Sequence, residues 1–416
     1  MEKLALLDGQ KYRAVPVGLR AHWPRDWISE KDLETVTKTI RKGEYWKKDE
    51  RNKLEKEWTK YCGAKKTISV INGTAALHIA VSAAGVGLGD EVIVPAFSFL
   101  SSATPILQNR GMPVFADICP DTFNINPELL EDKITRRTKA IIPVHAHGLP
   151  ADMDKINKIA KKHCLTVIED ACHAPGAEYK GRKTGSLGDF AAFSMHSTKN
   201  LAAFGGGLLT INNKGHEIDK IIHQEKDIVY ALYGLGWNYN YNEAGASFVR
   251  SQLKRLDKGN SWRQKNAEYL GKGLKSIKGL ALPFVPKDRT HSYFIYRILL
   301  KPEELNLKIS PVKFRDAVLE ALVAEGVDAQ TYETSPIPSQ PIFRELIGDE
   351  MKGRINKKYN ESNYPETVKM LNNSIVLYDS LYPPNGITLM DKYIEAFEKV
   401  FAFNNLERIL KHRKIL

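Results

Sequence analysis

The segment that decides the fold, residues 165–210, reads LTVIEDACHAPGAEYKGRKTGSLGDFAAFSMHSTKNLAAFGGGLLT. Its apolar runs LTVIED, DFAAFSMH and GGLLT have the length typical of buried strands. Between these runs stands a lone lysine, Lys199, among small, apolar and hydroxyl residues and ahead of three glycines. Other lysines lie in charge-rich runs such as KIAKKH, so the isolation of Lys199 requires an explanation.

The same rhythm extends toward the N-terminus, where short apolar runs alternate with helix-like runs. Buried strands that alternate with helices predict an α/β fold, in which helices cover both faces of a mostly parallel sheet. Asp152 or Asp154 is placed to cap one of these helices. The expected strands cover residues 66–72, 90–97, 112–118 and 138–148, and the expected helices cover 73–85, 101–111 and 151–164.

Beyond about residue 245 the pattern changes to one long amphipathic helix over 246–277, followed by a strand and two further helices. This predicts a smaller α+β domain joined to the first by the long helix. We expect an N-terminal segment over 1–45, a large domain over 46–255 and a small domain over 256–416. The basic end ERILKHRKIL is expected to be a solvated helix end.

The chain has 416 residues, of which 43% are hydrophobic and 26% charged, enough apolar residues for a sizeable core. Lysine and arginine exceed aspartate and glutamate by 61 − 49, a net charge of +12. The basic residues are scattered among acids, as in KDERNKLEKEW, which argues against a nucleic-acid partner. The charge is compatible with a small anionic substrate.

The four cysteines show no C-x-x-C spacing, so neither a zinc site nor a disulfide framework is indicated. No signal peptide is recognisable at the N-terminus. Residues 67–89 carry no Lys, Arg, Asp or Glu, but they read as strand, turn and helix rather than as a membrane span. We therefore expect a cytoplasmic protein with buried, reduced thiols and no membrane partner.

Ligands of an open parallel sheet bind beyond the carboxyl ends of its strands. Gly73 and Thr74 follow the first strand and open a helix, so their N–H groups and the hydroxyl could bind an anion; the alternative is an ordinary Thr helix cap. Phe99 follows the second strand and could stack on a flat ring; the alternative is core packing.

Two further strand ends carry ionisable groups. Asp170 ends an apolar strand, where a carboxylate needs a cationic partner such as a protonated pyridine; a helix cap is the alternative. Lys199 lies five residues after Ser194, in surroundings that favour a neutral, nucleophilic amine; an exposed loop lysine is the alternative. Together these groups are those that pyridoxal 5'-phosphate requires, including a Schiff-base lysine.

His145 and His147 lie two residues apart in an expected strand, where they would share one face. No third metal ligand is apparent in the sequence. We therefore predict structural or substrate-lining histidines and no metal site.

The chain resembles the DegT/DnrJ/StrS aminotransferases, which have the fold type I pyridoxal-phosphate architecture. The resemblance runs from about residue 25 to the end and is carried by NGTAALHIAVSAAGVGLGDEVIVPAFSF, VFADI, PVHAHGLPADMD, VIEDACHAPGAEYKGRKTGSLGDFAAFSMHSTKN and GWNYNYNE. GEYW and DACHAPGA look nearest to the branch of scyllo-inosose aminotransferases and aminohydroxybenzoate synthases. Nucleotide-sugar aminotransferases are close relatives.

The resemblance implies a role for each matching position. Lys199 would link covalently to the cofactor, and Asp170 would keep its pyridine nitrogen protonated. His173 would contact the region of the ring hydroxyl. The remaining positions would bind the cofactor: Phe99 stacked on the ring, Gly73, Thr74 and Ser194 at the phosphate, and Asn238 at the phosphate of a neighbouring subunit. The last contact implies a homodimer with shared active sites.

The reaction implied is transfer of an amino group from glutamate or glutamine to a ketone of a nucleotide-linked or phosphorylated sugar, or of a cyclitol. Three alternatives stay open: a dehydratase, an aminohydroxybenzoate-synthase type of reaction, and a non-catalytic cofactor-binding protein. Some relatives that are dehydratases carry His in place of the lysine, so Lys199 argues against that alternative. A P-loop NTPase is disfavoured because no G-x-x-x-x-G-K-[ST] motif is present.

Three positions depart from the family pattern. Asn240 stands where the family usually has Arg, and Tyr241 replaces a common Met. The residues 204–207, Phe-Gly-Gly-Gly, stand where the family usually reads G-E-G-G. The cofactor set is intact, so the departures concern the substrate and partner side of the site.

Overall fold

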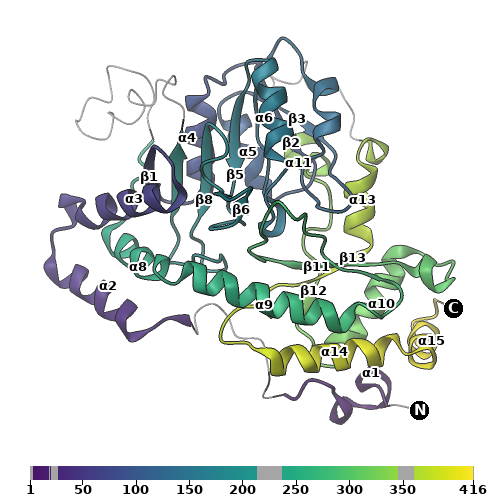
Figure 1. Ribbon diagram of the computed structural model, residues 1–416. Helices are drawn as coiled ribbons and strands as arrows, with labels where there is room; N and C mark the ends of the chain where they lie inside the picture. The colour runs from purple at the N-terminus through teal and green to yellow at the C-terminus, as the bar shows by residue number, and fades with distance from the viewer. Residues whose placement is uncertain (1–2, 18, 20–26, 213–236, 345–359, 416) are drawn as a thin grey trace.

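The structure is a computed structural model that describes residues 3–17, 19, 27–212, 237–344 and 360–415. A seven-stranded sheet occupies the upper half of Figure 1, and its strand order is β1-β9-β8-β5-β4-β2-β3. The strands are β1 (Lys66–Val70), β2 (Glu91–Pro95), β3 (Met112–Ala116), β4 (Thr138–Ile141), β5 (Thr166–Asp170), β8 (Phe190–Ser194) and β9 (Gly207–Ile211).

The strand directions place most carboxyl ends at one edge of this sheet. Strands β3, β2, β4, β5 and β8 pair in parallel, whereas β9 pairs antiparallel with both β8 and β1. Strand β1 therefore runs in the direction of the parallel set, and β9 is the exception. The expected mostly parallel α/β sheet is confirmed.

Helices cover both faces of the sheet, because successive strand residues point to opposite sides. On one face lies α4 (Gly73–Ala83), whose Ala76 and Ala80 are fully buried. On the other lies α6 (Met153–Lys162), which buries Ile156. Asp152, and not Asp154, caps α6 by accepting a hydrogen bond from the backbone N–H of Lys155.

The single long helix expected over 246–277 is wrong. The structure has α8 (Glu243–Leu253) and α9 (Leu256–Leu274), which break at Lys254 and Arg255. The break lets the two helices serve different cores. Helix α8 packs on α2 (Glu30–Lys42) and α3 (Asp49–Cys62), while α9 packs along α14 (Ile387–Phe401) of the small domain.

A second, antiparallel sheet forms the core of the C-terminal part, with strand order β10-β11-β13-β12. Helices α10, α14 and α15 pack against it, as Figure 1 shows below the large sheet. The C-terminal helix is not simply a solvated end, because its residues Leu406, Ile409 and Leu410 are buried in this core. The elements are β10 (Leu280–Ala281), β11 (Tyr296–Leu300), β12 (Ala329–Gln330), β13 (Ser374–Leu377), α10 (Pro311–Ala324) and α15 (Phe403–His412).

The N-terminal residues are seated on this second core. Leu4 is fully buried there, next to α1 (Ala5–Asp8). The buried carboxylate of Glu325 accepts hydrogen bonds from the backbone N–H groups of Ala5 (2.7 Å) and Ala14 (2.9 Å). Lys399 Nζ lies 2.9 Å from the same carboxylate and neutralises it. The division of the chain at residues 45 and 255 stays a prediction.

None of the helices within the described ranges is long and apolar enough to cross a membrane.

The remaining elements are short. These elements are α5 (Thr104–Gln108), α11 (Pro341–Arg344), α13 (Pro365–Asn372), the two-stranded sheet β6 (Glu178–Tyr179) and β7 (Arg182–Lys183), and 3-10 turns at Gln10–Tyr12, Tyr45–Lys47, Leu100–Ser102, Pro127–Leu129, Glu131–Lys133, Ala146–Gly148, Pro302–Leu305, Ile337–Ser339 and Glu361–Asn363.

Candidate active site

Lys199 lies just beyond the carboxyl end of β8 and is half-buried, so it is not the exposed loop lysine of the alternative reading. Its Nζ stands 3.9 Å from the centroid of the Phe294 ring. Burial lowers the pKa of Lys199 to about 8, although the nearby acidic groups Cys172, Asp170 and Glu333 oppose this shift. A sizeable fraction of this amine is therefore neutral near physiological pH.

Asp170 ends β5, as predicted, and is buried. Ser102 donates a hydrogen bond from Oγ to its Oδ2 at 2.6 Å, and the backbone N–H of Cys172 donates to its Oδ1 at 3.2 Å. These two donors fix the orientation of the carboxylate. The residue caps no helix, so that alternative is wrong.

His173 is buried, and its ring stacks on the Phe294 ring with centroids 4.3 Å apart. Burial, followed by the charge of Lys199, holds the pKa of His173 well below its ordinary value, so the ring is neutral. Its Nδ1 has no hydrogen-bond partner among the described residues. A buried ring nitrogen of this kind calls for a bound group.

Gly73 begins α4 and lies directly against the end of β8. A Cβ at this position would stand 2.8 Å from Cys172 Sγ and 3.0 Å from Ser194 Cβ, so a larger residue would displace these neighbours. Asn72, and not Thr74, caps the helix by accepting from the N–H of Ala75. The expected alternative of a Thr cap is therefore wrong.

The two predicted hydroxyl residues are both held close to this turn. Thr74 donates from Oγ1 to Ser101 Oγ at 2.9 Å. Ser194 accepts a hydrogen bond at Oγ from the backbone N–H of His196 at 3.3 Å. Gly73, Thr74 and Ser194 thus lie together where β1, α4 and β8 meet.

Phe99 is 55% exposed, whereas its near neighbour Phe97 is 3% exposed and belongs to the core. Core packing therefore explains Phe97 and not Phe99. Asn238 is exposed, and its Oδ1 accepts a hydrogen bond from Asn240 Nδ2 at 2.7 Å. No hydrogen bond among the described residues joins Asn238 to Lys199 within one chain.

The departures from the family pattern contact one another or a nearby cation. Tyr241 donates its hydroxyl to the carbonyl of Gly205 at 2.8 Å, and a Cβ on Gly206 would stand 2.6 Å from the Tyr241 ring. Arg51 of α3 donates from Nη1 to Asn240 Oδ1 at 3.1 Å. A guanidinium therefore lies beside position 240, although α3 supplies it.

Three aromatic residues of the small domain complete the site and were missed by the sequence analysis. Phe294, Tyr378 and Tyr332 form a closed ring of neighbours with His173. Their centroids are 5.1 Å apart for Phe294 and Tyr378, 6.1 Å for Tyr378 and Tyr332, and 6.3 Å for Tyr332 and His173. The one sequence feature that could have indicated them is their place at the borders of strands, since Phe294 precedes β11 and Tyr378 follows β13.

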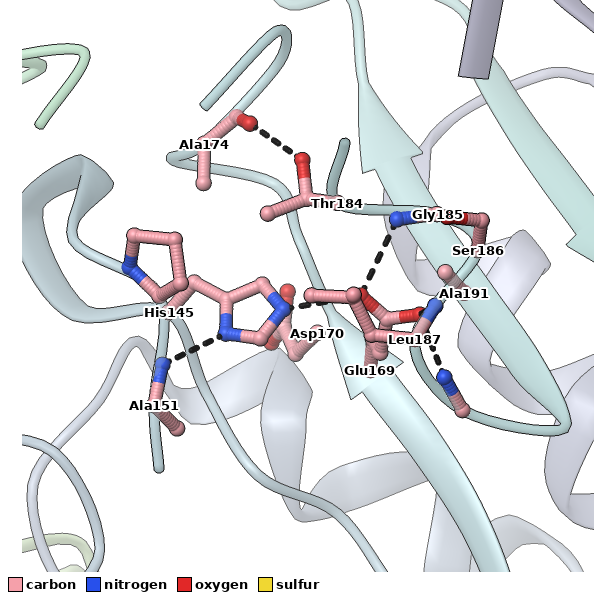
Figure 2. Close-up of polar contacts among 12 residues, drawn as sticks. His145, Ala151, Glu169, Asp170, Ala174, Thr184, Gly185, Ser186, Leu187 and Ala191 are labelled. Carbon is pink, nitrogen blue, oxygen red and sulfur yellow. Dashed lines mark hydrogen bonds and ion pairs between the residues drawn. The ribbon is translucent and has the colours of Figure 1, made fainter. Parts of the chain in front are cut away.

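Directly behind Asp170 lies a buried network centred on Glu169, which Figure 2 shows. The Glu169 carboxylate accepts hydrogen bonds from the backbone N–H groups of Gly185, Leu187 and Gly188. His145 Nε2 lies 2.9 Å from Glu169 Oε2, and His145 Nδ1 accepts from the N–H of Ala151. The imidazole proton therefore resides on Nε2 and is donated to Glu169.

The expectation that His145 and His147 share one face of a strand is wrong. Strand β4 ends at Ile141, and His147 lies in a 3-10 turn with a left-handed φ of 57°. Its Nε2 accepts from Arg297 Nε at 3.2 Å, away from Glu169. No group of three or more potential metal ligands is found among the described residues.

The residues fit pyridoxal phosphate. The unsatisfied His173 Nδ1 offers a partner for a polar substituent of the ring, and the oriented Asp170 carboxylate suits a protonated ring nitrogen. The turn at Gly73 leaves no room for a Cβ and carries the hydroxyls that suit a phosphate. A sheltered lysine amine beside these groups, on a mostly parallel seven-stranded sheet, defines a fold type I pyridoxal phosphate enzyme.

Comparison with known proteins identifies the family. Residues 26–364 match the model of the DegT/DnrJ/EryC1/StrS aminotransferase family. The chain belongs to this family and is a pyridoxal phosphate-dependent aminotransferase.

Two curated relatives and one solved structure illustrate the similarity. GDP-perosamine synthase of Caulobacter vibrioides is 35% identical over 72% of this chain and 80% of its own. A putative L-glutamine:3-amino-2,3-dideoxy-scyllo-inosose aminotransferase of Streptoalloteichus tenebrarius is 32% identical over 96% and 97%. The crystal structure of 3-amino-5-hydroxybenzoic acid synthase superposes with a TM-score of 0.80 at 28% identity, covering 93% and 98%.

Proposed function

We propose that this aminotransferase transfers an amino group from glutamate or glutamine to the ketone of a sugar or cyclitol. The observation that carries the proposal is the Lys199 amine, whose pKa of about 8 and position beside Asp170 and His173 suit reversible proton transfer. The curated relatives named above act, by their names, on a sugar nucleotide and on a cyclitol ketone.

Each residue has a proposed task. Bound pyridoxal phosphate supplies an aldehyde that accepts the amino group and a ring that withdraws electrons. Lys199 Nζ would hold the cofactor through that aldehyde, and the same amine would carry the proton to and from the carbon that exchanges its amino group. Asp170 holds a proton on the ring nitrogen, and Ser102 keeps its carboxylate aligned.

The other predicted residues bind and orient. His173 would offer its unpartnered Nδ1 to a polar substituent of the cofactor, and the exposed ring of Phe99 would be available to stack on it. Gly73, Thr74 and Ser194 hold the phosphate at the junction of β1, α4 and β8. Metal ions have no role in this proposal.

The direct test uses purified protein loaded with pyridoxal phosphate, glutamate or glutamine as donor, and a panel of keto sugars and scyllo-inosose. The expected product keeps the carbon skeleton of the ketone and gains an amino group, as mass spectrometry detects. Lys199→Ala should abolish turnover, whereas Lys272→Ala, a surface lysine paired with Glu268, should leave it unchanged. Full activity of Lys199→Ala would refute the assignment.

A second candidate reaction comes from the structural likeness to 3-amino-5-hydroxybenzoic acid synthase. In that alternative the same site eliminates water from a ring substrate. The product mass separates the two reactions, since elimination lowers the mass of the ring by one water and adds no nitrogen.

We further propose a homodimer in which Asn238 reaches the phosphate site of the neighbouring subunit. This is supported by the exposure of Asn238, whose amide is open to a neighbouring subunit. Mixing inactive Lys199→Ala and Asn238→Ala subunits should restore about a quarter of the activity, because half of the dimers are mixed and each holds one intact site. No recovery would refute shared sites.

The cytoplasm is the proposed compartment. The four cysteines are free of disulfides, which suits a reducing environment. The expectation of buried thiols is confirmed for Cys62; it is wrong for Cys164, which is exposed, and Cys119 and Cys172 are partly exposed.

A further inference from the structure

Glu333 is a carboxylate at the active site that no part of the proposed reaction uses. It follows β12 on the loop that carries Tyr332, whose ring faces His173. The residue is half-buried, and burial raises the pKa of Glu333 while the charges of Arg297 and Lys199 lower it. Its carboxylate therefore lies within electrostatic reach of the Lys199 amine.

Glu333 makes no hydrogen bond and no ion pair with any described residue, although two cations are close. The nearby Arg297 is buried, and it donates its hydrogen bonds to His147 Nε2, to the carbonyl of Tyr332 and to Ser374 Oγ. The structure thus holds a partly desolvated carboxylate apart from both cations. Its oxygens are not among the buried unpartnered side-chain atoms of the described residues, so they stay open to hydrogen bonds from a bound molecule.

The backbone conformation of Glu333 also indicates a functional position. Its φ is +51°, in the left-handed region that non-glycine residues adopt only at a cost. The carbonyl of Tyr332 is fixed by Arg297 Nη2 at 3.0 Å, which locks the loop in this conformation. A left-handed backbone that a buried guanidinium holds in place, on the loop whose Tyr332 ring faces His173, is a mark of a functional position.

The surroundings define what the carboxylate can bind. An ionised carboxylate accepts hydrogen bonds from hydroxyl groups and repels phosphates and other carboxylates. Tyr332 is the chain neighbour of Glu333, and its ring lies 6.1 Å from that of Tyr378; such aromatic surfaces suit the apolar edges of a ring.

We propose that Glu333 is a specificity-determining residue that accepts hydrogen bonds from ring hydroxyls of the acceptor. The inference rests on the proposed function, since the acceptor is the ketone of that reaction. It narrows the substrate class, because the part of the acceptor nearest Lys199 must be a neutral polyhydroxylated ring. Any phosphate or nucleotide must lie away from Glu333.

The test compares Glu333→Gln, which removes the charge and keeps the shape, with Thr334→Ala, an exposed neighbour on the same loop. Glu333→Asn is a second variant, because asparagine tolerates left-handed backbone. The readouts are the Kd of the unreactive ring scyllo-inositol for the holoenzyme, and KM and kcat with scyllo-inosose. A third readout is the pKa of Lys199 in the cofactor-free protein.

We expect both Glu333 variants to raise Kd and KM about 10- to 100-fold, the size of a lost charged hydrogen bond, with kcat changed less than about threefold. They should also lower the pKa of Lys199, because they remove an anion that raises it. Thr334→Ala should change none of these quantities.

An unchanged Kd and KM in both variants of an active enzyme would overturn the role of Glu333 alone. A wild-type holoenzyme that aminates no ketone would refute the proposed function, and the Kd for scyllo-inositol would then still decide whether Glu333 binds ring hydroxyls.

Discussion

At the scale of single residues, the site depends on a lysine that burial makes less basic. Desolvation of Lys199 is the largest effect, and Cys172, Asp170 and Glu333 limit it. The balance leaves an amine that both bonds to an aldehyde and carries a proton near neutral pH.

This balance predicts a measurable titration. In the cofactor-free protein, labelling of Lys199 by an amine-reactive reagent should show a midpoint near pH 8, whereas an ordinary lysine titrates at about 10.4. Asp170→Asn should move the midpoint lower, since loss of the anion destabilises the ammonium form. Peptide mass spectrometry across a pH series gives both values. A midpoint near the ordinary value of about 10.4 would contradict the buried environment.

The sequence predicted the residues of the large domain better than those of the small domain. Gly73, Asp170 and Lys199 stand at strand ends that the apolar runs make visible. Phe294, Tyr332 and Tyr378 come from a loop and from the borders of short strands, more than 90 residues along the chain from Lys199. No local pattern marks such a long-range contact, so the aromatic wall could not be predicted.

At the scale of elements, Tyr241 packs against the turn that leads from Lys199 into β9. Gly205 and Gly206 both have positive φ, of 99° and 117°. The two glycines differ in the room available for a side chain. A Cβ on Gly205 would approach nothing closer than 4.0 Å, whereas a Cβ on Gly206 would lie 2.6 Å from the Tyr241 ring. The two family departures, at 205 and 241, are thus one packed unit.

Matched alanine variants at Gly205 and Gly206 separate the cost of steric overlap from the cost of backbone strain. Gly206→Ala should lower the free energy of unfolding by about 1–3 kcal/mol more than Gly205→Ala, the usual cost of overpacking. Combining Gly206→Ala with Tyr241→Leu should recover part of that loss. Urea unfolding followed by circular dichroism measures all four proteins. Equal losses for the two single variants would show that steric contact with Tyr241 is unimportant.

The buried pair behind β5 is a second element-scale device. Glu169 ties the turn over 185–188 to the strand that carries Asp170 (Figure 2). Glu169→Gln should lower the free energy of unfolding by about 3 kcal/mol, because it leaves buried backbone donors and His145 poorly paired. The half-exposed control Glu178→Gln, whose partner is Lys183, should cost less than about 1 kcal/mol. Similar costs for both would contradict a special role for the buried pair.

Element types were largely predictable, but breaks and turns were not. The apolar runs predicted the large sheet because its strands are buried on both faces. The break between α8 and α9 follows no proline and no glycine, so only the two competing cores explain it. The left-handed turn at His147 likewise depends on its contact with Arg297.

At the scale of the whole molecule, one buried acid sets a pH dependence of stability. Asp379 is 4% exposed, and its Oδ1 has no hydrogen-bond partner among the described residues. Burial, together with Asp328, raises the pKa of Asp379 to about 7. Between pH 4 and pH 7 the unfolded chain therefore loses this proton while the folded protein keeps it, so stability falls as pH rises.

Asp379→Asn should remove this dependence. At pH 8 the variant should be more stable than the wild type, by up to about 4 kcal/mol, and the difference should vanish below pH 4. Thermal unfolding at a series of pH values checks this, with the exposed Asp132→Asn as the control. A wild-type Tm that does not fall between pH 5 and pH 7 more than that of the variant would contradict the prediction.

The packing of residues 4–14 on the second core has a consequence for the order of folding during synthesis. Ala14 bonds to a carboxylate 311 positions later, and Tyr12 to an ammonium 387 positions later. Loops of this length close late and slow the formation of native contacts. On the ribosome the seven-stranded sheet can assemble before α10 (Pro311–Ala324) and α14 (Ile387–Phe401), on which residues 4–14 pack, have emerged. Residues 4–14 are therefore among the last to reach their native contacts.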